Sequence, residues 1–157
     1  MKRTLFFSVA LATAGSAAGA DAVPYPEGYR NWTHVKSMII NPGHALYDAF
    51  GGIHHIYANG KAMAGYKGGK FADGSVIVFD LLEAKSADNA VTEGARKVVG
   101  VMVKDAKKYA ATGGWGFEGF KGDSKTERAV GANAAKACFE CHAAQRANDY
   151  VFSKYRP

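Results

Sequence analysis

The alternation of apolar and polar residues predicts a chain built mainly from β-strands. Residues 75–82 form a nearly continuous apolar run, which is typical of a strand buried on both faces. Shorter strand candidates occupy residues 33–40, 53–58, 98–104 and 113–120. In the last of these, Trp115 and Phe117 fall on the same face of a glycine-rich strand.

Short helices are expected between these strands. Residues 44–50 suit one helical turn, and residues 105–111 suit a short helix. Asn59-Gly60 fits either a tight hairpin turn or the start of a helix capped by Asn59, and the lack of β-branched residues in 61–66 favours the helix. The stretch from Glu127 onward is expected to lead into a further helix. The pattern predicts an α+β domain with a mostly antiparallel β-sheet, short helices and a C-terminal helix.

The C-terminal helix carries the sequence Cys138-Phe139-Glu140-Cys141-His142, a C-x-x-C-H motif. Two thiols three positions apart can add to the two vinyl groups of one porphyrin. The histidine that follows can offer an imidazole nitrogen to the iron. The motif therefore predicts one covalent haem c, with Cys138 and Cys141 as attachment residues, His142 as axial ligand and the C-terminal helix as the haem-attachment helix.

Zinc binding and redox dithiol chemistry are the alternatives for the two thiols. A zinc site of this type needs a second pair of ligands, and Cys138 and Cys141 are the only cysteines in the chain. A redox dithiol usually begins a helix directly after a strand. The run before Cys138 is instead alanine-rich and polar, so haem attachment is the favoured interpretation.

Residues 1–20 have the pattern of a secretory signal peptide. Lys2 and Arg3 give a positive start, an apolar run of about ten residues follows, and Ala18-Gly19-Ala20 resembles a cleavage site. The apolar run is too short to span a bilayer, and no later segment is long and apolar enough to do so. The sequence predicts a soluble, exported protein in which residues 21–157 form a single haem c-binding domain, and haem c attachment suggests the periplasm.

The charge balance adds little to this prediction. The chain has 20 lysines and arginines against 14 acidic residues, and two of the basic residues belong to the predicted leader. The charges are scattered along the sequence rather than grouped in a stripe. A mixed, solvated surface is expected, and nucleic-acid binding is not.

Four stretches of the chain together resemble the cytochrome P-460 family. They are Tyr29-Arg30-Asn31-Trp32, the turn and strand start Phe71-Ala72-Asp73-Gly74-Ser75-Val76, the C-terminal C-x-x-C-H and the closing Val151-Phe152. The resemblance covers nearly all of the mature chain, and the aromatic-Asp-Gly turn before a strand is its most specific part. It implies a β-rich haem c domain, typically a homodimer, with an open position on the distal side of the iron.

The resemblance also gives a role to Phe79. In hydroxylamine-oxidising members of the family, a lysine from this strand cross-links to the porphyrin edge, and the matching position here holds Phe79. Phenylalanine has no nucleophile for such a bond. The chain is in this respect similar to the cytochrome c′-beta branch, whose members bind small gases beneath phenylalanine side chains.

Five-coordinate iron is expected, with His142 as the protein ligand. A sixth ligand would have to come from Met38, Met63, Met102 or one of the four remaining histidines. Methionines at strand or helix spacing more often pack in a core. His54 and His55 are neighbours on a predicted strand, so their side chains point to opposite faces.

Phe50 and Phe79 are the candidates to cover the open iron position. From the residues alone, ordinary core packing explains both, whereas the resemblance favours a distal cap. Phenyl rings donate no hydrogen bond to bound dioxygen or peroxide, so such a pocket favours nitric oxide and carbon monoxide. Arg146 follows His142 by four residues and would share its helix face, where it either tunes the imidazole or is simply solvated.

Three functions remain open at this point. The first is a haem protein that binds nitric oxide and buffers or relays it, and the second is an enzyme that oxidises hydroxylamine or nitric oxide. The third is a plain electron carrier with a redox partner protein. The lysine position separates the first two, and a sixth iron ligand would indicate the third. Phe79 favours binding over catalysis, and no catalytic residue is assigned.

Overall fold

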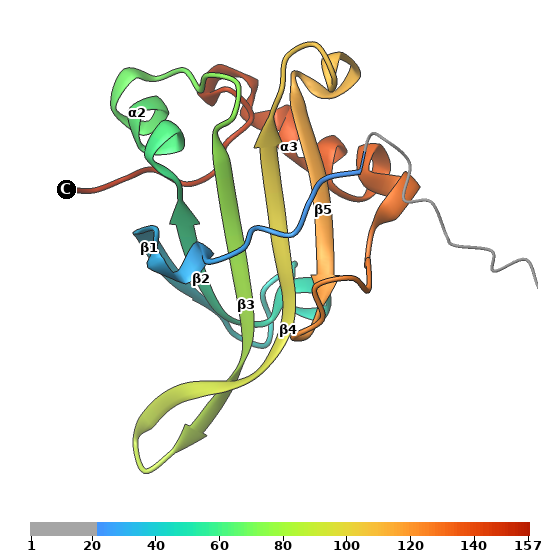
Figure 1. Cartoon of the computed structure of the whole chain (residues 1–157). Coiled ribbons are helices and arrows are strands. Elements are labelled where there is room, and N and C mark those ends of the chain that lie inside the picture. The colour runs from blue at the N-terminus through green and yellow to red at the C-terminus, as the bar shows by residue number, and fades with distance from the viewer. Residues whose placement is uncertain (1–21) are drawn as a thin grey trace, which may run out of the picture.

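The computed structural model describes residues 22–157, and the predicted leader at residues 1–20 lies outside this range. The centre of the fold is a five-stranded sheet with strand order β1-β2-β3-β4-β5. Each strand pairs antiparallel with the next in the chain (Figure 1). The predicted α+β class with an antiparallel sheet is confirmed.

The strands are β1 (Thr33–Ile40), β2 (Gly52–Ala58), β3 (Val76–Ala87), β4 (Ala90–Lys104) and β5 (Trp115–Lys121). The α-helices are α1 (Tyr47–Phe50), α2 (Gly60–Gly68) and α3 (Glu140–His142). The 3₁₀ turns are η1 (Tyr29–Asn31), η2 (Ala110–Thr112), η3 (Gly131–Asn133) and η5 (Ala143–Asn148), and η4 (Ala135–Phe139) is a π-helical turn. None of the described helices is both long and apolar enough to cross a membrane.

Strands β3 and β4 are longer than the sequence pattern predicts. They join through a two-residue turn in which Asp88 and Asn89 have φ of 51° and 59°. Positive φ at both positions is the geometry of a tight hairpin turn that follows the twist of the strands. The arm extends beyond the rest of the sheet in Figure 1, and residues 83–87 of β3 are exposed. Because neither face of the arm is buried, it carries no apolar alternation.

Asn59 caps α2, as predicted. Its side-chain oxygen accepts from the backbone N–H of Ala62 at 2.9 Å, which satisfies one of the free donors of the first helical turn. The same side chain also binds Gly74 and Val76, so it ties the helix to the start of β3. The helix predicted at residues 105–111 is wrong. That stretch makes turns and η2, and Gly113 and Gly114, both at positive φ, then direct the chain into β5.

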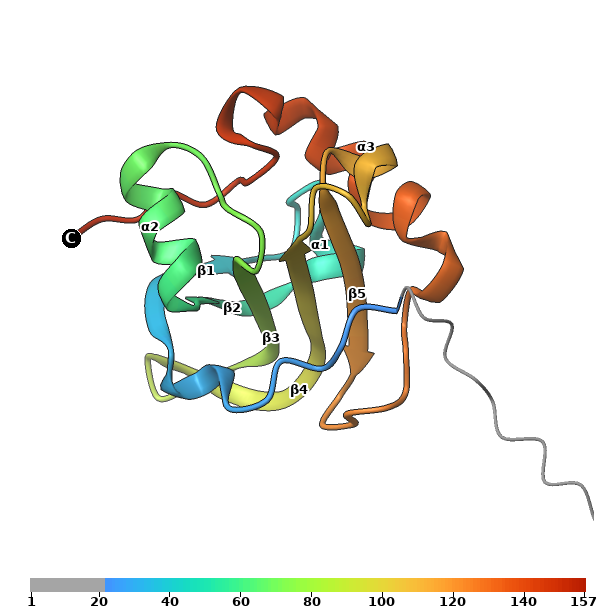
Figure 2. The ribbon, with the colours of Figure 1, turned by 45° about the horizontal axis from the view of Figure 1, so that its top comes forward.

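The sheet has two faces with different coverings. The helical face carries Ile77, Phe79, Met102 and Phe117, and the outer face carries Val78, Asp80, Val99 and Phe120. Figure 2 shows α2 and the C-terminal helical segment on the helical face and the N-terminal segment across the outer face. The apolar core is therefore split into two clusters, one on each side of the sheet.

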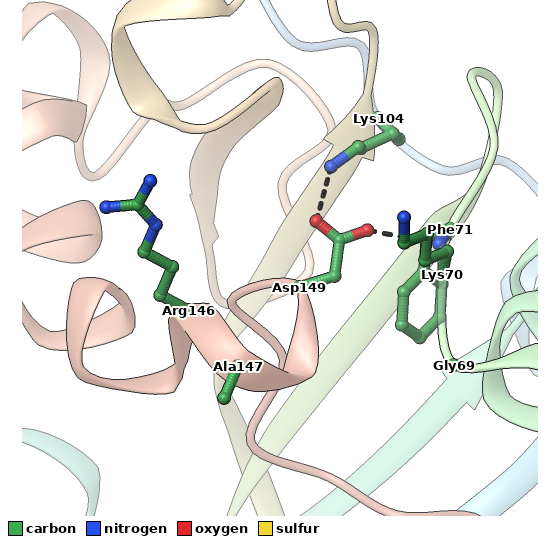
Figure 3. A pocket seen from close by; sticks show the side chains of 7 residues that line it. All are labelled: Gly69, Lys70, Phe71, Lys104, Arg146, Ala147 and Asp149. Atoms are coloured by element: carbon green, nitrogen blue, oxygen red, sulfur yellow. Dashed lines mark hydrogen bonds and ion pairs between the residues drawn. The ribbon is translucent and has the colours of Figure 1, made fainter.

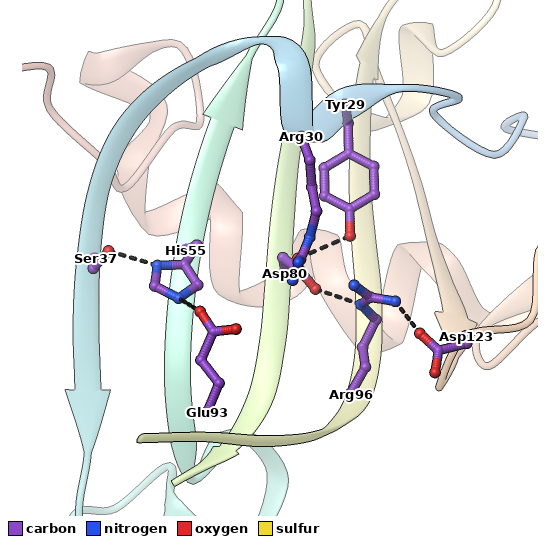
Figure 4. Close-up of polar contacts among 8 residues, drawn as sticks. All are labelled: Tyr29, Arg30, Ser37, His55, Asp80, Glu93, Arg96 and Asp123. Carbon is purple, nitrogen blue, oxygen red and sulfur yellow. Dashed lines mark hydrogen bonds and ion pairs between the residues drawn. The ribbon is translucent and has the colours of Figure 1, made fainter. Parts of the chain in front are cut away.

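Asp80 organises the polar part of the outer face. Its carboxylate is fully buried and accepts from the Tyr29 hydroxyl at 2.8 Å and from Arg30 and Arg96, each at 2.8 Å (Figure 4). Burial, and then the hydrogen bond to Asp80 and its charge, raise the pKa of Tyr29 well above its usual range. Tyr29 and Arg30, two of the residues that suggested the family, therefore fasten η1 to the centre of the sheet.

Candidate haem site

The C-x-x-C-H motif lies on a helical segment that is not one regular helix. Cys138 lies in η4, Cys141 and His142 lie in α3, and η5 follows. Within η5, Gln145 departs from helical geometry with φ −98° and ψ 22°. The predicted C-terminal helix is confirmed, but it passes from π to α to 3₁₀ geometry along its length.

The beginning of this segment is held by Glu118 of β5. We call residues 128–150 the attachment segment. Glu118 accepts from the Arg128 guanidinium at 2.7 Å and from the backbone N–H groups of Val130 and Gly131 at 3.2 and 3.0 Å. Burial acts to raise the pKa of Glu118, but Arg128 and the backbone donors outweigh it, so that this pKa lies below its ordinary value. A charged Glu118 thus fixes the segment where it leaves the sheet.

The two thiols of the motif differ in environment. Cys138 is partly buried beside the helical-face cluster, whereas Cys141 is exposed, and both are free. Burial, and then the charges of Glu118 and Cys141, raise the pKa of Cys138 to about 11. Redox dithiols and thiolate nucleophiles need a lowered pKa instead. The environment of Cys138 disfavours the dithiol interpretation and is compatible with a thioether.

His142 is oriented by a single strong contact. Its Nδ1 donates to the carbonyl oxygen of Tyr150 at 2.7 Å, so its Nε2 carries the free lone pair. The ring lies 5.0 Å from the Phe117 ring and 4.9 Å from the Phe152 ring. Burial lowers the pKa of His142, partly opposed by the Tyr150 carbonyl, and therefore favours the neutral imidazole that a metal requires.

Phe50 and Phe79, far apart in the sequence, lie together in the structure. Their rings meet edge to face, with centroids 5.8 Å apart and planes at 89°. Phe79 stands on the helical face opposite Ile56 and Gly100, and Phe50 is the last residue of α1 and is 38% exposed. The two predicted cap residues thus form one aromatic pair on the face to which the attachment segment is bound.

His54, which the sequence suggested only as one of several possible sixth ligands, is a third member of this group. It is 2% exposed, its ring lies 4.5 Å from the Phe79 ring, and its Nε2 donates to the Phe50 carbonyl. Its Nδ1 is buried without a hydrogen-bond partner in the described part of the chain. Burial lowers the pKa of His54, against the effect of the Phe50 carbonyl. His54 therefore holds Phe50 in place as a neutral ring.

His55 points the other way, as the strand pattern predicted. Its Nδ1 lies 2.7 Å from the Ser37 hydroxyl and its Nε2 lies 2.7 Å from the Glu93 carboxylate, both on the outer face (Figure 4). Lys97, in contrast, was missed by the sequence interpretation. Its ammonium donates to the Gly51 carbonyl at 2.9 Å and so fixes the residue next to Phe50. Only folding brings Lys97 and His54 to α1.

Arg146 does not continue a regular helix from His142, because the chain kinks at Gln145. It lines a cavity of about 330 Å³ together with Gly69, Lys70, Phe71, Lys104, Ala147 and Asp149. In Figure 3 the Arg146 side chain extends away from Asp149, which instead faces Lys104 and Phe71. Its predicted influence on the imidazole stays a prediction. Lys70 belongs to this cavity and not to the pair of Phe50 and Phe79.

The fold and the site define a class of protein, a haem-binding α+β domain with the attachment motif near its C-terminus. The Cytochrome P460 family model matches residues 26–153. The chain therefore belongs to the cytochrome P460 family, and its cofactor is haem. A comparison with curated proteins gave no match.

The residues on the helical face fit a haem. Next to Phe79, β4 presents Gly100, so no side chain from that strand position crowds the edge of the Phe79 ring, whereas Gly119 one strand further is covered by Ala129 and Val130 of the attachment segment. A Cβ at Gly100 would approach that ring to 3.2 Å. A flat group can come close to such a surface. His142 supplies a neutral nitrogen, and the exposed Phe50 and Phe152 supply apolar contact.

Proposed function

We propose that this chain is an exported c-type cytochrome that binds nitric oxide and carbon monoxide. Cys138 and Cys141 bond one haem covalently, and His142 ligates its iron through Nε2. When bound, the haem supplies an iron centre with affinity for small diatomic molecules. Phe50 and Phe79 would cover the other side, as the resemblance to the cytochrome c′-beta branch implies, and the role that we propose is the buffering or relay of nitric oxide.

The observation that carries the proposal is the pair of Phe50 and Phe79. The two rings share the helical face with Phe117, which contacts His142. Phe79 is on β3 and Phe117 is on β5, and these strands are two strand spacings apart, about 10 Å. A ring pair in this position offers a crowded apolar surface without a hydrogen-bond donor. Neutral diatomic ligands depend little on such donors, whereas activation of dioxygen or peroxide depends on them.

Phe79 also separates binding from the chemistry of the cross-linked relatives. It occupies the middle of β3, between the strand partners Ile56 and Gly100. Lys97 reaches the residue next to Phe50, but its ammonium is engaged by the Gly51 carbonyl. We therefore expect a macrocycle that is joined to the chain only through two thioethers. Such a protein would bind ligands rather than oxidise hydroxylamine.

A spectrum of the ferrous protein tests this function. Five-coordinate iron and an unmodified macrocycle are expected before gas is added, followed by saturable binding of carbon monoxide and nitric oxide. A six-coordinate ferrous spectrum would favour an electron carrier. A spectrum typical of a cross-linked macrocycle, together with hydroxylamine turnover, would favour the enzyme.

A second copy of this chain is the partner proposed for β1. This strand forms one edge of the sheet, and Met38 and Ile39 on it are 51% and 44% exposed. Edge strands with exposed apolar side chains are prone to pair with another chain. Light scattering should give the mass of a dimer, and Ile39→Lys should shift it toward the monomer, while a monomeric wild type would exclude the homodimer.

A further inference from the structure

We propose that Lys104 and Asp149 form a clamp that orients His142 through the carbonyl group of Tyr150. The inference rests on the haem-attachment part of the proposed function and adds positioning residues to it. Neither residue touches His142 itself. Their effect would pass through the backbone at the end of the attachment segment, where the chain turns back toward α2.

The clamp begins with a largely buried ion pair. The Lys104 ammonium lies 2.7 Å from Asp149 Oδ1, with side-chain exposures of 10% and 18% (Figure 3). The second oxygen of Asp149 accepts from the backbone N–H of Phe71 at 3.0 Å. Lys104 also donates to the Gly113 carbonyl at 3.1 Å. Both charges are thus paired and hydrogen-bonded, and Asp149 is held at once from the end of β4 and from the connection between α2 and β3.

The backbone of Asp149 is fixed as firmly as its side chain. Trp115, which is fully buried, donates from Nε1 to the Asp149 carbonyl at 2.8 Å. Asp149 and Tyr150 have φ of 50° and 65°, in the left-handed region. Aspartate tolerates this region, but an aromatic residue rarely adopts it. Two consecutive residues of this kind persist only where surrounding contacts impose them, and Lys104, Phe71 and Trp115 supply those contacts.

This unusual turn is what presents the Tyr150 carbonyl to His142. The carbonyl accepts from His142 Nδ1 at 2.7 Å, directly after the clamped residue. Gly113 leaves room for the Tyr150 ring, because a Cβ there would come within 2.3 Å of it. A hydrogen bond at Nδ1 sets the orientation of the imidazole and raises the basicity of the ligating nitrogen. The clamp would therefore strengthen the bond between His142 and iron.

A purely structural pair would stabilise the fold without affecting His142. The test therefore needs readouts at the iron as well as a measure of folding. Lys104→Met removes the cation and keeps much of the apolar stem. Asp149→Asn keeps the volume, the acceptor for Phe71 and the tolerance of left-handed geometry, but removes the charge. Lys121→Met is the matched control, because Lys121 pairs with Glu127 at 2.8 Å with both side chains more than half exposed.

The experiment compares the iron–histidine stretching frequency and the reduction potential of the haem-loaded proteins. We expect a lower frequency and a higher potential in Lys104→Met and Asp149→Asn, with normal far-ultraviolet circular dichroism, and wild-type values in Lys121→Met. Wild-type values in all folded variants would overturn the clamp. If Lys104→Met does not fold, Asp149→Asn decides by the same readouts, and failure of both to fold would assign a structural role only.

The two proposals fail in different ways. A wild-type protein with histidine-ligated haem that binds no gas refutes the gas-binding function and leaves the clamp to be decided by its variants. Unchanged iron–histidine readouts in variants of a gas-binding protein refute the clamp alone. A wild-type protein without histidine-ligated haem refutes both.

Discussion

The two faces of the sheet are made by the same strands and differ in what they bury. On the outer face, the Asp80 carboxylate is fully buried and accepts hydrogen bonds from Tyr29, Arg30 and Arg96. On the helical face, the adjacent residue Phe79 meets Phe50 and His54 through ring contacts. Neighbouring residues of β3 thus serve a charge network on one side and an aromatic surface on the other.

This difference assigns separate tasks to the two faces. The outer face ties the N-terminal segment to the sheet through paired charges, and such a buried network is costly to break at one member. The helical face carries the thiols, His142 and the aromatic pair, which we propose contact the haem. We therefore expect outer-face substitutions to act on stability and helical-face substitutions to act on the iron and its ligands.

Asp80→Ala should give the largest loss of stability. It leaves Arg96 and the Tyr29 hydroxyl without their buried partner, and removal of one member of a buried pair costs about 3–5 kcal/mol. Urea unfolding measures the loss, and the fraction that remains folded should bind carbon monoxide normally. Asp123→Ala is the control, since Asp123 also pairs with Arg96 but is 81% exposed, and it should cost less than about 1 kcal/mol. Equal losses in both variants would contradict the central role of Asp80.

Phe79→Ala should combine a moderate loss of stability with a change at the iron. The truncated ring is only partly buried, so a loss of about 3 kcal/mol, at the low end for phenylalanine, is expected. Carbon monoxide association, followed by flash photolysis, should become faster because the cap opens. Phe120→Ala removes a fully buried ring of the outer face and should destabilise the protein without changing that rate. An unchanged rate in Phe79→Ala and in the double variant with Phe50→Ala would reject the cap.

Glu118 should make the stability of the folded protein depend on pH. Its pKa is lower in the folded protein than in the unfolded chain, so the unfolded chain binds more protons as the solution is acidified. The stability from this group is complete above the unfolded pKa and is lost as the pH falls through the folded pKa. Glu118→Gln should lose about 1–3 kcal/mol at pH 7 and show a shallower loss of stability below pH 5 than the wild type. Parallel pH profiles in urea unfolding would contradict this role.

Arg146→Gln should have the smallest effect on stability. The side chain is exposed and lines the cavity beside Asp149, so a change within about 0.5 kcal/mol is expected. A shifted reduction potential at unchanged stability would support the predicted influence of Arg146 on His142. An unchanged potential would leave Arg146 as a solvated residue.

Strong local signals explain what the sequence could predict. The strand at residues 75–82, the cap at Asn59 and the opposite orientations of His54 and His55 all follow from patterns of a few residues. The hairpin arm was missed because residues 83–87 are exposed on both faces, and Asp88-Asn89 is a weaker turn signal than a pair containing glycine. The helix at residues 105–111 was wrong because the two glycines that follow redirect the chain.

The site was predicted as far as its residues are local or belong to a known pattern. Cys138, Cys141 and His142 form one motif, and Phe50 and Phe79 came from the family resemblance. The contact of Lys104 with Asp149 spans 45 residues, and the contact of Lys97 with Gly51 spans 46. No periodic pattern in the sequence predicts contacts between residues so far apart in the chain. The turn that holds His142 does have a local signal, because residue 149 is an aspartate and this residue type tolerates the left-handed region.

Mass spectrometry of the denatured protein tests the central claim most directly. The intact chain should retain the mass of one haem after denaturation, and peptide mapping should place it on the peptide that contains Cys138 and Cys141. No third covalent link should appear, at Lys97, Lys70 or elsewhere. Recovery of the bare polypeptide mass with free haem, or a haem joined to the chain through a lysine, would contradict a two-thioether haem c bound beneath Phe50 and Phe79.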